Sequence, residues 1–170
     1  GDLKLMNNEA LVNIPGADAT VNVSDLIVHG NIYQNNNSGG GLQLYPGDGL
    51  DHVRLTLKGE GNHAYSVTSG TSASLHSILM DKGSDQSSTF TFNNDFTLNG
   101  PTSGAGVDKA LTLQNGTLVL NDPGINMDLT TGDDDFYIPG SSALEVRQGQ
   151  VNAIGNSGIL LDGLLQVSGG

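Results

Sequence analysis

Leu111-Thr112-Leu113-Gln114-Asn115-Gly116-Thr117-Leu118-Val119-Leu120 is the stretch that decides the fold. On both sides of Gly116, apolar residues alternate with others, and alternation with a period of two predicts β-strands. The glycine between them predicts a tight corner, because glycine adopts backbone conformations that other residues avoid. Two short strands joined at a corner are therefore the expected building unit.

Short apolar-x-apolar units recur along the whole chain. Most are followed closely by Gly, Asn or Asp, and they include residues 3–5, 21–23, 42–44, 55–57, 90–92, 96–98, 144–146 and 165–167. Very short strands with turn residues every ~7–12 residues indicate an all-β stack. A helical stripe of apolar residues over ten or more positions is absent, so helices are not expected.

Two stretches share a longer pattern. Residues 111–118 and 144–151 both run apolar-x-apolar, two polar residues, glycine, one residue, apolar. Their offset is 33 positions (144 minus 111), and self-similarity at a period of about 20–50 residues predicts a solenoid or a propeller. We therefore expect the two stretches in neighbouring coils, with Gly116 near Gly149 at matching corners. A coil of this length needs a loop, for which residues 130–135 are the expected place.

The fold class that we predict is all-β, a single-stranded right-handed parallel β-helix of roughly 6–8 coils. Residues 1–170 are expected to form one solenoid segment of a longer chain. The 25 glycines fit many tight corners, and asparagines at equivalent corners can stack into hydrogen-bonded ladders. An antiparallel β-sandwich or jelly roll is the alternative, since it also needs many short strands and glycine turns.

The net negative charge of the chain argues against two classes of partner, nucleic acids and membranes. Six basic residues stand against 18 acidic ones, for a formal net charge of −12. Binding to nucleic acid requires a basic surface, so a nucleic-acid partner is not expected. An anionic membrane surface would repel the chain, and no stretch approaches the ~20 apolar residues of a membrane-spanning helix. Membrane insertion is therefore not expected either.

Residues 111–120 and 143–149 are similar to the right-handed β-helical stalks of very large bacterial surface proteins. These proteins include autotransporter passengers, filamentous-haemagglutinin-like adhesins and giant adhesins of gliding or biofilm bacteria. Residues 31–37 and 163–170 have the same style. The resemblance implies an extracellular, non-enzymatic rod on the bacterial cell surface that forms or presents an adhesive surface.

The expected partners follow from this architecture. Both ends of a β-helical stack expose unpaired strand edges. We therefore expect contact with neighbouring segments of the same chain or with identical subunits end to end. Host or environmental glycans or surfaces are the other expected partners.

Two acidic stretches are candidate calcium sites, and no other cofactor is expected. Gly47-Asp48-Gly49-Leu50-Asp51-His52-Val53 matches the core of the calcium-binding repeats of β-rolls, with Asp48 and Asp51 as ligands. The match occurs once, whereas such sites need tandem copies, so an acidic turn is the competing interpretation. Asp133, Asp134 and Asp135 are three adjacent carboxylates that suit calcium chemistry, and a solvated loop is the alternative there.

A carbohydrate-binding or polysaccharide-cleaving β-helix is the alternative function. Asp133 and Asp134 resemble the aspartate pair of polygalacturonase-type enzymes, but all four histidines (His29, His52, His63 and His76) lie upstream of them. A Gly-His-Gly or Arg-x-Lys segment does not follow, so we predict that the chain is not an enzyme. Four tyrosines, at positions 33, 45, 65 and 137, suit either sugar platforms or core and corner packing. A sandwich subunit that polymerises by strand exchange is a second alternative.

Overall fold

The computed structural model describes residues 1–7, 9–12, 22–35, 41–45, 51–105, 109–132 and 134–169. These residues contain sixteen strands and no helix, and hence no helix able to cross a membrane. Every strand pairing among them is parallel. The chain is thus a parallel β-solenoid of about five turns. The antiparallel sandwich is wrong, and the strand-exchange alternative loses its basis.

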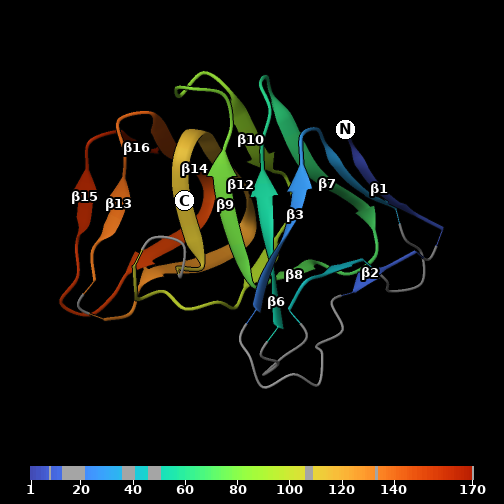
Figure 1. Cartoon of the computed structure of the whole chain (residues 1–170), viewed down its shortest axis with the longest axis horizontal. Coiled ribbons are helices and arrows are strands. Elements are labelled where there is room, and N and C mark those ends of the chain that lie inside the picture. The colour runs from blue at the N-terminus through green and yellow to red at the C-terminus, as the bar shows by residue number, and fades with distance from the viewer. Residues whose placement is uncertain are drawn as a thin grey trace.

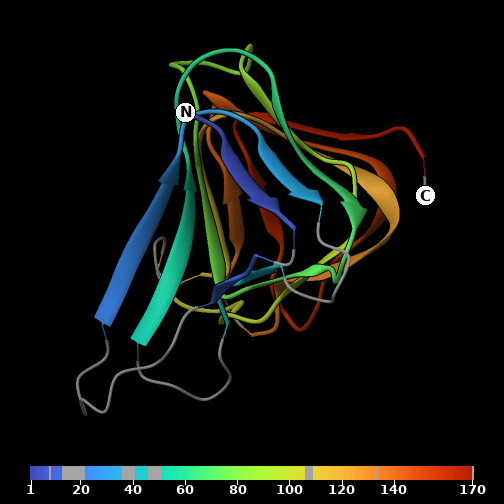
Figure 2. The same cartoon turned by 90° about the vertical axis from the view of Figure 1, so that its right-hand side faces the viewer.

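The strands lie on three faces around the stack, which Figure 1 shows from the side and Figure 2 along its length. The first face runs in the order β1 (Leu3–Met6), β4 (Ile32–Asn35), β7 (His63–Ser69), β10 (Thr89–Phe92), the middle of β12 (Leu111–Thr130), the start of β14 (Ser142–Ala153) and β16 (Leu164–Val167). The second face holds β2 (Leu11–Val12), β5 (Leu42–Gln43), β8 (Ala73–Leu75) and β11 (Phe96–Leu98). The later parts of β12 and β14 pair with each other at the corresponding place in their own turns.

The third face begins with β3 (Asn22–Val28), β6 (Asp51–Leu57), β9 (Ser77–Asp81) and the start of β12, in that order. A separate pair follows, β13 (Phe136–Ile138) with β15 (Ile159–Leu161). In Figure 1 this face looks toward the viewer, with β3 and β6 to the right and β13 and β15 at the far left. β12 ends at Thr130 and β13 begins at Phe136, so the stretch in which the sequence predicts a loop connects these two strands.

Side chains of the first face form an apolar column inside the stack. Successive partners are Leu3, Ile32, Tyr65, Phe92, Leu120, Val146 and Val167, which are 29, 33, 27, 28, 26 and 21 residues apart. The members from Ile32 to Val146 are at most 2% exposed. Burial of one such side chain stabilises a fold by about 1.5–3 kcal/mol. One turn of the coil thus takes 21 to 33 residues.

The expected register of the two similar stretches is wrong. Leu118 lies beside Leu144, and Gly116 lies beside Ser142 instead of Gly149. Residues 111–113 belong to the third face and residues 144–146 to the first. The shared pattern therefore marks a strand followed by a corner, and the two copies occupy different corners of the coil.

Asparagines do connect successive turns, as the sequence predicts. The Asn121 side chain donates to the side-chain oxygen of Asn93 at 3.0 Å, and Asn152 donates to Asn126 at 3.1 Å. Each pair links two adjacent coils, and both pairs lie next to a register shift in the ladder between β12 and β14. Such rungs satisfy polar groups at corners, where the backbone ladder is interrupted.

Candidate functional site

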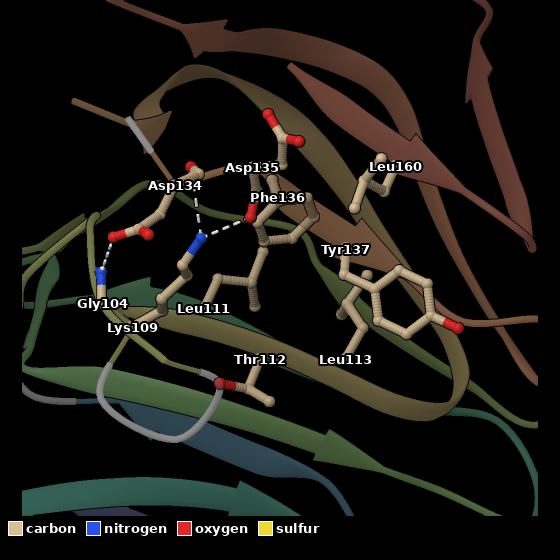
Figure 3. A pocket seen from close by; sticks show the side chains of 10 residues that line it. All are labelled: Gly104, Lys109, Leu111, Thr112, Leu113, Asp134, Asp135, Phe136, Tyr137 and Leu160. Atoms are coloured by element: carbon tan, nitrogen blue, oxygen red, sulfur yellow. Dashed lines mark hydrogen bonds between the residues drawn. The ribbon is translucent and has the colours of Figure 1, made fainter. Parts of the chain in front are cut away.

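A cleft opens where the third face is interrupted. The start of β12 pairs with β9 on one side and β13 pairs with β15, but within the described residues β12 and β13 share no ladder. The cleft between them has a volume of about 330 Å³. Figure 3 shows its lining, which Leu111, Thr112 and Leu113 provide from one strand and Phe136 and Tyr137 from the other.

Lys109 bridges the two sides of this cleft. Its ammonium donates to the backbone carbonyls of Asp135 at 2.5 Å and Asp134 at 3.4 Å (Figure 3). The side chain comes from the turn before these aspartates, and the residue is only 7% exposed. Charge-assisted hydrogen bonds of this kind are about twice as strong as neutral ones. Lys109 therefore joins two successive turns where the strand ladder is absent.

The carboxylates of Asp134 and Asp135 point to different neighbours. Asp134 accepts from the backbone amide of Gly104 at 2.7 Å, and Asp135 accepts from that of Gly158 at 2.6 Å. The two side chains are thus used separately, to fix loops of adjacent turns. The part of the chain that the structure describes contains no group of three histidine, aspartate or glutamate side chains placed to hold a metal ion.

The other calcium candidates lie outside what the structure describes. Asp48 and Asp133 are not among the described residues, and for Asp51 only the backbone, at the start of β6, is described. The calcium sites proposed from the sequence therefore stay predictions at all five positions.

The mouth of the cleft carries exposed apolar groups. Tyr137 is 48% exposed and Leu160 is 55% exposed. The Tyr137 hydroxyl donates to the carboxylate of Asp162 at 2.7 Å. This hydrogen bond to an anion raises the pKa of the Tyr137 hydroxyl, so the tyrosine stays a neutral donor.

Two histidines from different strands stack at the corner between the second and third faces. The rings of His52 and His76 are 3.8 Å apart between centroids and nearly parallel. The His76 Nδ1 lies 3.1 Å from the hydroxyl of Ser77, and these two residues are 8% and 3% exposed. Burial, with a contribution from His52, lowers the pKa of His76 to about 4. A histidine and a serine this deeply buried form a packing contact, closed to a substrate.

A second buried lysine sits at the corner between the third and first faces. Lys82 is fully buried, and its ammonium donates to the carbonyls of Lys58 at 3.1 Å and Gly59 at 3.3 Å. It also lies 2.8 Å from His63 Nδ1. Desolvation lowers the pKa values of both Lys82 and His63. This cluster ties consecutive turns together, as Lys109 does.

A shallow groove crosses the outside of the first face. It has a volume of about 410 Å³ and lies over β1, β4 and β7, with Tyr33 on the middle strand. Of the four tyrosines, Tyr65 is fully buried in the apolar column, while Tyr33 and Tyr137 are 39% and 48% exposed. Tyr65 thus has the core-packing role that the sequence left open, and a sugar-platform role for the exposed tyrosines stays a prediction.

No protein-family model, curated protein or solved structure matches this chain. The class that the fold defines is the parallel β-solenoid. The similarity to β-helical stalks of bacterial adhesins is compatible with this class and rests on the sequence pattern.

Proposed function

We propose that this chain is a non-enzymatic structural segment of a bacterial cell-surface rod or filament, located outside the cell. In this proposal its solenoid is continued by further turns, supplied either by neighbouring sequence or by another copy. Its outer faces present adhesive contacts.

The observation that carries the proposal is the open end of the interior column. Val167 is the register partner of Val146, which is 2% exposed, yet Val167 is 65% exposed. Leu161 is the partner of the fully buried Ile138, yet it is 52% exposed. Both side chains lie in core positions of a turn that no described residue covers.

The strand edges at this end are also available. Among the described residues, β16 pairs only with β14 and β15 pairs only with β13. A row of unpaired backbone donors and acceptors is a template for another strand. A further turn would satisfy this edge and bury Leu161 and Val167 at the same time, so strand pairing and apolar burial favour the same contact.

Sedimentation velocity over a wide concentration range tests this proposal. The purified chain should form longer species as its concentration rises, and Leu161→Lys and Val167→Lys should keep it monomeric, because each puts a charge on the end of the column. Leu160→Lys is the matched control. It changes the same residue type on the same strand at similar exposure, 55% against 52%, but its side chain points outward.

Two outcomes contradict the proposal. One is a chain that stays monomeric at every concentration while the amides of β16 are protected from hydrogen exchange. The other is an equal effect of Leu160→Lys and Leu161→Lys, which would place the contact on the outer face instead of the column end.

A further inference from the structure

The groove on the first face combines an exposed aromatic ring with polar side chains from three consecutive turns. Its lining includes Lys4, Met6, Tyr33, Asn35, Ser66 and Thr68. Lys4 lies beside Tyr33 in the ladder, and Tyr33 lies beside Ser66. The intervening Ile32 and Gln34 are at most 1% exposed and face the interior. Strand alternation thus holds the groove residues on the outer side of a rigid sheet.

Lys4 is the one basic side chain that the described part of the chain leaves without a hydrogen-bonded partner. The other five are occupied: Arg54 by Asp25, Lys58 by Asp81, Arg147 by Glu145, and Lys82 and Lys109 by backbone carbonyls. Lys4 is exposed, and its ammonium lies over the Tyr33 ring, 5.9 Å from the ring centre. A ligand that stacks on this ring takes the place of the ammonium, whose donors are then available to the hydroxyl groups of the ligand.

The groove as a whole is close to electrically neutral. Asp2, which also lines it, accepts from the backbone amide of Asn31 at 2.8 Å. That hydrogen bond lowers the pKa of the Asp2 carboxyl, so Asp2 is ionised and balances Lys4. An anionic ligand would meet this carboxylate and the net charge of −12 on the chain. The charges therefore favour a neutral ligand.

The groove also offers neutral hydrogen-bonding groups. Asn35 uses its side-chain oxygen to accept from Ser69 at 3.0 Å, while its amide nitrogen donates to no described residue. The Ser66 hydroxyl lies one strand further along the groove. Adjacent strands are about 4.8 Å apart, which is close to the length of one sugar ring. Three strands thus match about two consecutive rings of an extended chain of sugars.

We propose that this groove binds neutral hexopyranose units of a glycan. The apolar face of one ring stacks on Tyr33, and the hydroxyl groups of the sugars receive hydrogen bonds from Lys4, Asn35 and Ser66. As an adhesive contact of a surface rod this inference rests on the proposed function. The binding site itself needs only the first three turns.

Titration calorimetry tests the site, with cellohexaose, mannohexaose and chitohexaose as neutral probes and hexagalacturonate as the anionic probe. At least one neutral probe should bind, and Tyr33→Ala should weaken its binding about tenfold, because an aromatic stacking contact contributes up to about 1.5 kcal/mol. Lys4→Gln should weaken it by a smaller factor. Tyr137→Ala is the matched control, since Tyr137 is equally an exposed tyrosine (48%) but lies on the third face, and it should leave binding unchanged.

The glycan proposal is overturned if no neutral probe binds, if only hexagalacturonate binds, or if Tyr137→Ala weakens binding as much as Tyr33→Ala. Repeating the titration with the Val167→Lys variant tests glycan binding independently of assembly into a rod. Binding by a monomeric Val167→Lys variant supports the groove. A chain that assembles but binds no neutral probe keeps the rod and removes the groove.

Discussion

At the scale of single residues, glycines determine where the chain turns a corner of the coil. Gly116 and Gly149 both have φ of 90°, and a side chain at either would meet two backbone carbonyls of the preceding turn. The sequence pattern predicts these corners correctly. It does not predict which corners lie side by side, because the same local motif serves at two different corners of the coil. Register is a property of whole turns, and here the turns differ in length.

Alanine variants of Gly116 and Gly61 distinguish backbone strain from steric crowding of the added Cβ. A Cβ there would lie 2.9 Å from the carbonyl oxygens of Lys82 and Ser88, whereas Gly61, at φ 84°, has no atom within 4 Å of such a Cβ. We expect Gly116→Ala to lower the free energy of unfolding by about 2–3 kcal/mol. Gly61→Ala should cost only about 1 kcal/mol, from backbone strain alone. Urea unfolding of both variants measures the difference, and equal losses would show that the close approach at Gly116 is not a constraint.

Lys82 and Lys109 are residues that the sequence did not single out. Each binds carbonyls that lie 23 to 26 positions away along the chain. No local pattern signals such a contact, since an isolated lysine in a polar stretch ordinarily indicates an exposed side chain. Only the length of the turns identifies these two lysines, because this length places each lysine beside carbonyl groups of an adjacent coil.

At the scale of the elements, the corner between β8 and β9 is joined to β6 by stacked imidazoles. His52 belongs to β6, and His76 is the single residue between β8 and β9. The sequence predicts the strand at residues 55–57 of β6 but not this stack, because the two histidines come from separate stretches of the chain. Two neutral rings can stack closely, whereas two protonated rings would repel each other.

This stack predicts how stability depends on pH. The pKa of His76 falls from 6.5 to about 4 on folding, so between these values the unfolded chain binds a proton that the folded chain does not. The free energy of unfolding should therefore be highest above pH 6.5. It should decrease as the pH falls toward 4, by up to about 3 kcal/mol. His76→Gln should flatten this part of the profile, whatever its effect at neutral pH.

Urea unfolding at a series of pH values checks this. His63, whose pKa is also lowered, will leave some slope in the variant. Asp25 and Asp81, whose pKa values are lowered from 3.8, add slope below about pH 5, and they do so equally in the unmodified chain and the variant. An unchanged slope in His76→Gln between pH 6.5 and 4 would show that His76 does not titrate as the buried stack requires.

For the whole molecule, the fold class was accessible from the sequence because its signal is distributed over every turn. Each coil repeats short alternating strands and corner residues, so errors at single positions cancel. The turns differ in length, since loops lengthen the individual coils up to 33 residues between Ile32 and Tyr65. The cleft and the groove were not predicted, because a surface hollow depends on which residues of different turns become neighbours.

A stack in which each turn contacts only its neighbours should not unfold uniformly. In solenoids, local stability is the sum of a turn's own contribution and its two interfaces, and an end turn has one interface. The last strands, β15 and β16, are largely exposed, whereas four of the five residues of β9 are buried. Hydrogen exchange of the monomeric Val167→Lys variant should therefore be slowest in β9, β10 and the start of β12 and fastest in β15 and β16. In the unmodified chain at high concentration, protection of β16 should rise if another turn covers it. Uniform exchange across all strands would instead show that the solenoid opens as a single unit, so that its open end is not a weak point.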